Sequence, residues 1–146
     1  MNHERVLAYA TEVSRSSKLH EPAHWARVAE TRPQLVRETP GADLHVVELF
    51  AALHDAQRLS DSHDPRHGRR AAELALELEG ILFEVTDEQL TLLTEAIAAH
   101  ADGFVSEDPT IGVCFDADRL DLLRCGIHPH PGLLSTPAAR RRIGAA

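Results

Sequence analysis

Apolar residues recur every three or four positions along almost the whole chain, which is the spacing of one face of an α-helix. No segment alternates apolar and polar residues in the way that predicts a β-strand. The 146 residues are 43% hydrophobic, which is enough apolar material for one core. We therefore expect an all-α fold, in which residues 1–146 form one compact single-domain bundle of about six to seven helices.

Breaks rich in polar residues, glycine and proline divide this pattern into separate helices. The expected helices cover about 4–13, 22–38, 44–56, 65–79, 87–100, 113–125 and a short stretch from 137 onward. Pro33 falls inside the second helix, where a proline removes a hydrogen bond, so we expect a kink or a split there. The segment 39–41, Thr-Pro-Gly, then ends that helix.

Four of the expected helices carry a recognisable start signal. An Asp or Thr at the N-cap accepts a hydrogen bond from a first-turn N–H, and proline is tolerated at the first helical position. A Gln three residues after the N-cap Thr completes a capping box. The signals are Asp43, Asp64 followed by Pro65, Thr86 with Gln89, and Thr136 followed by Pro137.

The charge balance argues against several classes of partner. Acidic residues outnumber Lys and Arg by 23 to 15, for a net charge of −8, whereas nucleic-acid binding needs clustered cations. No run approaches the roughly 20 apolar residues of a membrane helix. The first ten residues, MNHERVLAYA, lack the apolar core of a secretory signal. We therefore expect a cytoplasmic protein that does not bind membranes.

The ten histidines are the unusual feature of the composition, because histidine is the most frequent metal ligand among side chains. At about 100° per residue, several ionisable side chains fall on the apolar face of a predicted helix. His54, for example, continues the stripe formed by Val47 and Phe50. The inward-facing set, one from each of five helices, is His24, His54, His67, His100 and Asp118.

A buried carboxylate without a partner costs several kcal/mol, so Asp55 and Asp118 each need a cation or strong hydrogen-bond donors. A divalent ion bound by imidazole and carboxylate groups would serve both residues at once. This mixture of nitrogen and oxygen ligands suits Mn, Fe, Ni, Co or Zn better than Ca. The sequence therefore predicts a divalent transition-metal ion in the centre of the bundle.

Three segments, HEPAHWARV, VVELFAALHDA and CFDADRLDLLR, resemble the HD-domain superfamily of metal-dependent phosphohydrolases. The similarity spans nearly the whole helical region, as in a small stand-alone HD protein. It implies a helical bundle with a central metal ion held by His24, His54, Asp55 and Asp118. Asp116, the other aspartate of the DAD triplet, is the less favoured alternative to Asp118.

Two further histidines have roles that the sequence leaves open. Some members of the superfamily have the order His, His-Asp, His, His, Asp and hold two metal ions, with the aspartate of the pair bridging them. His67 and His100 fall in this order, and Asp55 would be the bridging residue. Because His67 follows Asp55 by only twelve residues, a second metal site and a role toward the substrate phosphate remain equal alternatives.

The resemblance implies hydrolysis of a nucleotide or another small phosphate ester, by a phosphomonoesterase or phosphodiesterase reaction. A bound metal lowers the pKa of its water toward about 7 and so supplies a metal-bound hydroxide as nucleophile. We expect Asp55 to take part in catalysis, with His67 or His100 protonating the leaving group. Arg58, one turn after Asp55, would contact the phosphate through its planar guanidinium.

Two other functions fit the same residues. Di-iron oxygenases share the HD fold and the six-ligand order, and would use His67 and His100 as true ligands. A non-catalytic module that binds a metal or a nucleotide for regulation is the third alternative. The identity of the substrate stays open, and so does assembly into a homodimer.

Overall fold

The computed structural model describes residues 31–54 and 66–144, without the side chains of residues 124 and 125. Over these ranges the chain is helical and contains no strand, only an isolated bridge between Glu79 and Phe83, so the all-α prediction is confirmed. The elements are α3 (Leu44–Leu53), α4 (His67–Leu78), α5 (Asp87–Ala99), α6 (Pro109–Leu120), the 3-10 helices η1 (Asp121–Cys125) and η2 (Pro131–Leu133), and α7 (Pro137–Arg142).

The helix expected over 4–13 and residues 22–30 of the next one lie outside the described residues. Residues 31–37, which include Pro33, are helical. A turn follows over 38–41, where the sequence places the end of this helix, and Gly41 adopts a φ of 88° that favours glycine.

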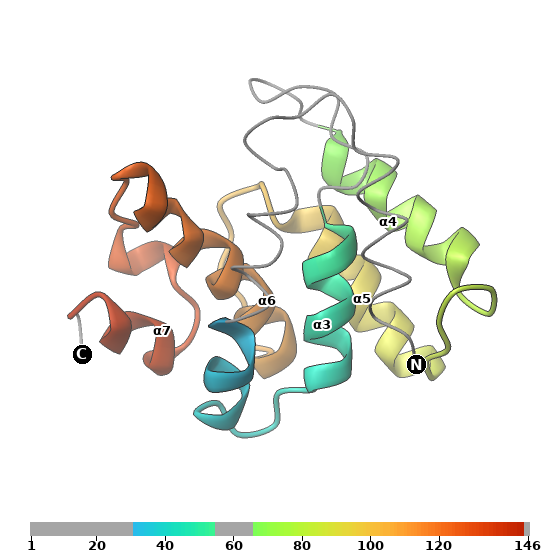
Figure 1. The fold of residues 1–146 in the computed structure, drawn as a ribbon, viewed down its shortest axis with the longest axis horizontal. Coiled ribbons are helices and arrows are strands. Elements are labelled where there is room, and N and C mark those ends of the chain that lie inside the picture. Colours follow the sequence, from blue (N-terminus) through green and yellow to red (C-terminus); the bar gives the residue numbers. More distant parts are fainter. Residues whose placement is uncertain (1–30, 55–65, 145–146) are drawn as a thin grey trace.

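Helices α3 and α5 lie side by side in the centre of the molecule (Figure 1). Helix α4 packs on α5 from one side, while α6 packs on both α3 and α5 from the other. Helix α7 contacts the outer side of α6. The apolar stripes of α3, α5 and α6 meet in one core, in which fully buried side chains include Val46, Leu49, Phe50, Leu53, Leu93, Ile97 and Val113.

Three of the four predicted start signals are confirmed by hydrogen bonds. The Asp43 carboxylate accepts from the N–H groups of His45 and Val46 at the start of α3. Thr86 and Gln89 form the complete capping box of α5. Thr136 accepts from the N–H of Ala139 at the start of α7. Each signal acts within a single helical turn, which is why the sequence predicts it well.

Two predicted helix starts are wrong. Helix α4 begins at His67, with Arg66 at the N-cap position and no side-chain capping bond; the predicted cap, residues 64–65, lies outside the described residues. Helix α6 begins at Pro109 rather than at 113, because Asp108 accepts from two first-turn N–H groups and Pro109 occupies the first position. The expected helix over 113–125 also changes from α to 3-10 geometry at Asp121, as helix ends often do.

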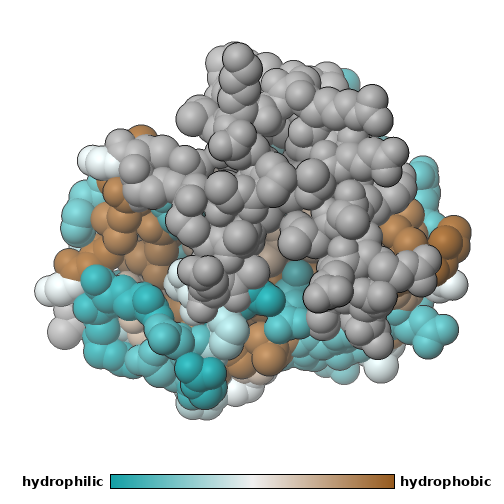
Figure 2. Space-filling view, viewed as in Figure 1, coloured by the Kyte–Doolittle hydropathy of each residue, from teal (hydrophilic) through white to brown (hydrophobic). Residues whose placement is uncertain are grey.

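Within the described residues, no helix is long and apolar enough to cross a membrane. Apolar side chains nevertheless reach the surface in places (Figure 2). The exposed apolar side chains include Leu122 and Leu123 in η1, and Ile81 in the turn after α4, which is 73% exposed.

Candidate metal centre

Four of the predicted site residues lie at helix ends that converge in the core. His54 directly follows α3, His67 is the first residue of α4, and His100 directly follows α5. Asp118 lies in the last turn of α6. All three histidines are buried. The other predicted residues, His24, Asp55 and Arg58, lie outside the described residues.

The structure brings His54 and Asp118 together across 64 positions of sequence. The Nε2 atom of His54 is 3.1 Å from Oδ1 of Asp118. The His54 side chain is fully buried, whereas that of Asp118 retains 18% of its exposure. The carboxylate therefore lies at the edge of the core, between the buried imidazole and the outside.

The hydrogen bond of the other ring nitrogen, Nδ1, indicates whether Nε2 of His54 can donate a proton to Asp118. Its Nδ1 atom lies 2.9 Å from the carbonyl oxygen of Phe50. A carbonyl only accepts hydrogen bonds, so Nδ1 carries the proton and donates it. A neutral His54 then presents a lone pair on Nε2 to a carboxylate oxygen of Asp118, which is also an acceptor. Two acceptors at 3.1 Å repel each other unless a proton or a cation lies at the contact.

His67 and His100 form a second pair. Their Nε2 atoms are 2.9 Å apart, and Nδ1 of His100 lies 2.7 Å from the carbonyl oxygen of Ile97. By the same reasoning, Nδ1 of His100 donates to Ile97, and Nε2 of a neutral His100 accepts. His67 is then the donor, with the shared proton on its Nε2 atom.

The two pairs belong to one buried cluster. The rings of His54 and His100 meet edge to face with centroids 5.1 Å apart, and Phe50 stacks on His54 at 4.6 Å. Gly68 allows this approach, because a Cβ atom there would lie 2.7 Å from the carbonyl oxygen of Ile97. Only a residue without a side chain lets α4 come so close to the end of α5.

Asp116 has a different role from Asp118. It is fully buried, and its carboxylate accepts from the N–H of Ser135 at 2.6 Å, the N–H of Thr136 at 2.8 Å and the Thr136 hydroxyl at 2.7 Å. Burial raises the pKa of the Asp116 carboxyl, and these three donors oppose that shift. Asp116 thus connects α6 to the segment before α7 through hydrogen bonds, and none of these bonds involves the histidine cluster.

Arg119 binds main-chain carbonyl groups next to the histidine cluster, and the sequence did not predict this role. Its buried guanidinium donates to the carbonyl oxygen of Leu133 at 2.6 Å and, more weakly, to that of His100 at 3.5 Å. The same group lies 4.9 Å from the centre of the Phe115 ring. Burial lowers the pKa of Arg119, while the nearby Asp118 and Asp116 act in the opposite direction.

The donor atoms of each pair have a spacing that suits a metal ion. Two ligands at about 2.0–2.2 Å from one ion lie about 2.8–3.6 Å apart at octahedral or tetrahedral angles. The His54–Asp118 and His67–His100 separations of 3.1 Å and 2.9 Å fall in this range. Metal-bound histidines also usually donate their other ring N–H to a carbonyl or carboxylate, as His54 and His100 do.

Within 31–54 and 66–144, however, no three or more His, Cys, Asp or Glu residues are grouped so that they could hold a metal ion. Each pair supplies two donors, and a complete ligand set would also need the predicted ligands His24 and Asp55. Both lie outside these ranges. The described residues by themselves therefore do not make up a complete set of metal ligands.

The chain was compared with protein-family models, with curated proteins and with solved structures. No family model matches the chain, and no match was found among curated proteins or among solved structures. The resemblance to HD-domain phosphohydrolases therefore stays a prediction from three sequence segments.

Proposed function

We propose that this protein is a metal-dependent phosphohydrolase that acts on a nucleotide or another small phosphate ester. His54 and Asp118 would be metal ligands together with His24 and Asp55. The observation that supports this proposal most is the 3.1 Å contact between His54 Nε2 and Asp118 Oδ1, because a neutral His54 whose Nδ1 donates to Phe50 would turn a lone pair toward the carboxylate. A divalent cation bound by both atoms removes their repulsion and matches their spacing.

When bound, a divalent ion lowers the pKa of a coordinated water and offsets negative charge on a phosphoryl group. The residues of the chain supply orientation. The hydrogen bond from His54 Nδ1 to the Phe50 carbonyl fixes the ring so that Nε2 points at Asp118. The bond from His100 Nδ1 to Ile97 fixes the second ring in the same way.

His67 is suited to proton transfer. In the neutral pair its Nε2 atom holds a proton between two buried imidazoles, 2.9 Å from His100. After the pair has taken up one further proton, the imidazolium N–H of His67 can protonate the oxygen of a leaving group and leave a neutral imidazole, while His100 keeps the His67 ring in place. This role and that of a second metal ligand use the same nitrogen atoms, so only one of them applies at a time.

Metal content and turnover test the proposal together. Protein purified without added metal should carry a transition-metal ion by elemental analysis, or bind Mn²⁺ or Zn²⁺ by calorimetry. It should also release phosphate from a nucleoside monophosphate or from p-nitrophenyl phosphate. His54→Gln and Asp118→Asn should lower metal affinity by roughly 10–100-fold or more, and phosphate release with it.

His45→Gln is the matched control, since His45 lies in the first turn of the same helix and bonds an exposed carbonyl, that of Glu84. It should leave metal affinity and turnover unchanged. The proposal would be ruled out if the protein bound no divalent metal and released no phosphate from the nucleoside monophosphate or from p-nitrophenyl phosphate. In that case a proton, not a metal ion, satisfies the His54–Asp118 contact.

The di-iron oxygenase is kept as a second candidate because of the His67–His100 pair. Two buried imidazole nitrogens 2.9 Å apart are a second set of donors at ligand spacing. Two iron atoms per chain and oxygen uptake without phosphate release would favour this function. Metal binding without turnover of any substrate would instead favour the regulatory module.

A further inference from the structure

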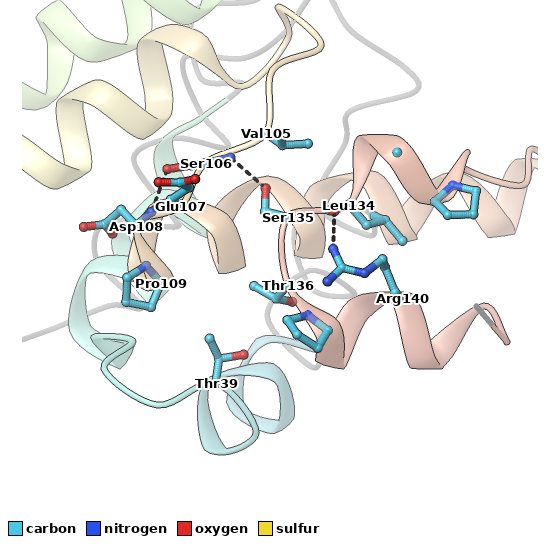
Figure 3. A pocket seen from close by; sticks show the side chains of 13 residues that line it. Thr39, Val105, Ser106, Glu107, Asp108, Pro109, Leu134, Ser135, Thr136 and Arg140 are labelled. Atoms are coloured by element: carbon cyan, nitrogen blue, oxygen red, sulfur yellow. Dashed lines mark hydrogen bonds between the residues drawn. The ribbon is translucent and has the colours of Figure 1, made fainter. Parts of the chain in front are cut away.

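A pocket of about 560 Å³ lies between the first turn of α6 and the first turn of α7 (Figure 3). Its described walls come from residues 105–109, residues 131–132, residues 134–137, Thr39 and Arg140. The volume lies within the range of about 300–1,000 Å³ that is usual for small-molecule sites. The predicted site residues that the structure describes lie elsewhere, in the histidine cluster.

The wall formed by 134–136 is held in place without a ligand. Asp116 binds the main-chain N–H groups of Ser135 and Thr136 from behind. On the other side, the N–H of Ser106 donates to the Ser135 hydroxyl at 3.1 Å. A pocket whose walls are already fixed loses little conformational entropy when it binds a ligand.

Arg140 brings a positive charge into this pocket. Its half-buried side chain extends from α7 between Leu134 and Thr136, and one nitrogen donates to the Leu134 carbonyl at 3.0 Å (Figure 3). Within the described residues no carboxylate lies within ion-pair distance of it, whereas the neighbouring Arg141 pairs with Glu38. A guanidinium has five N–H donors, so the remaining ones can bind an anion.

Thr39 supplies a second, independent indication of a ligand. The residue is only 8% exposed, and its hydroxyl is buried without a hydrogen-bond partner among the described residues. A buried hydroxyl that lacks a partner is unfavourable, and the great majority of such groups in proteins are satisfied. Because Thr39 lines this pocket, a polar atom of a bound molecule would satisfy it.

The remaining lining residues define the class of ligand. Asp108 uses its carboxylate to cap α6, and Glu107 is exposed, so two acids share the wall with one arginine. A second negative charge on the ligand would face these acids. The rest of the described lining is largely apolar and includes Val105, Pro109, Pro131, Leu134 and Pro137.

We propose that this pocket binds a small organic monoanion. Its carboxylate pairs with Arg140, its apolar body lies against the prolines and Leu134, and a polar atom reaches the Thr39 hydroxyl. The site is separate from the histidine cluster, because α6 lies between them: Asp116 faces the pocket wall and Asp118 faces His54.

Benzoate serves as the probe and benzyl alcohol as its neutral counterpart. In amide NMR spectra of the full chain, millimolar benzoate should shift the signals of residues 105–109 and 131–140, and benzyl alcohol should bind about tenfold more weakly. Arg140→Gln should raise the dissociation constant of benzoate about tenfold. Arg141→Gln, the same change one residue further along α7, should leave it unchanged.

Thr39→Val keeps the volume of the side chain and removes the hydroxyl. The free protein should melt at the same temperature or higher, because no hydrogen bond among the described residues is lost, while benzoate should bind several-fold more weakly. Three results would overturn the proposal: no benzoate shifts in the pocket segments, equal binding of benzyl alcohol, or equal losses in the Arg140 and Arg141 variants. None of them depends on metal binding or phosphate release.

Discussion

The two faces of α6 place the same type of side chain in opposite surroundings. Asp116 is fully buried and meets three hydrogen-bond donors, while Asp118, two positions later, is partly exposed and lies 3.1 Å from Nε2 of His54. A carboxylate matched by donors stabilises the fold by itself. One that faces another acceptor does so only when a proton or cation joins it. The first is a structural residue and the second is a candidate ligand.

Two glycines, Gly68 beside the histidine cluster and Gly112 on α6, also differ in the space that their surroundings leave for a side chain. A Cβ atom at Gly68, where α4 meets α5, would lie 2.7 Å and 2.9 Å from main-chain oxygens of α5. A Cβ atom at Gly112 of α6 would lie 3.1 Å and 3.3 Å from the Ser135 and Thr136 side chains. Contacts below 3.0 Å with main-chain atoms of a helix force the backbone to move, whereas contacts of 3.1–3.3 Å need a shift of only a few tenths of an ångström. Gly68 is therefore the more tightly constrained of the two glycines.

Alanine substitution of the two aspartates tests the contrast most strongly. In metal-free protein, Asp116→Ala should lower the free energy of unfolding by about 3–5 kcal/mol, because it leaves three buried donors without a partner. Asp118→Ala should cost less than this, because the Asp118 carboxylate keeps 18% of its exposure and its interactions are therefore partly screened by solvent. Urea denaturation of both variants measures the difference. Equal losses would show that Asp118 is also held by a proton in a structural pair.

The glycine comparison has the next largest expected effect. Gly68→Ala should destabilise the fold by about 2–3 kcal/mol, because the clash with the carbonyl oxygens outweighs the gain in helix propensity. Gly112→Ala should cost about 1 kcal/mol or less, since a shift of a few tenths of an ångström accommodates the methyl group. Thermal unfolding of the two variants checks the order. A larger loss at Gly112 would contradict this order of the two glycines.

Arg119 connects the two regions and should show a smaller effect. Arg119→Met keeps the packing on Phe115 but removes the hydrogen bonds to the carbonyls of Leu133 and His100, at a cost of about 1–2 kcal/mol in unfolding free energy. Arg119→Lys, which retains a donor, should recover part of that loss. Denaturant titration of both variants provides the measurement. An unchanged stability in Arg119→Met would mean that the two carbonyls find other donors.

Local signals in the sequence were enough to predict most helix ends and the inward faces. The caps at Asp43, Thr86 and Thr136 act within one turn, and the burial of His54 follows from the periodicity of α3. Asp108 followed by Pro109 is the same kind of local signal, and it marks the true start of α6. The start of α4 carries no side-chain cap to detect.

What the chain alone determined is therefore the helical class and the burial of His54, His67 and His100, which depend on neighbours a few positions away. The tertiary structure decided which of these groups meet. The His67–His100 and His54–Asp118 contacts span 33 and 64 positions, and Asp116 and Arg119 received their partners from the segment 133–136. Such contacts depend on how whole helices pack, and helical periodicity specifies which face is buried without specifying what that face will touch.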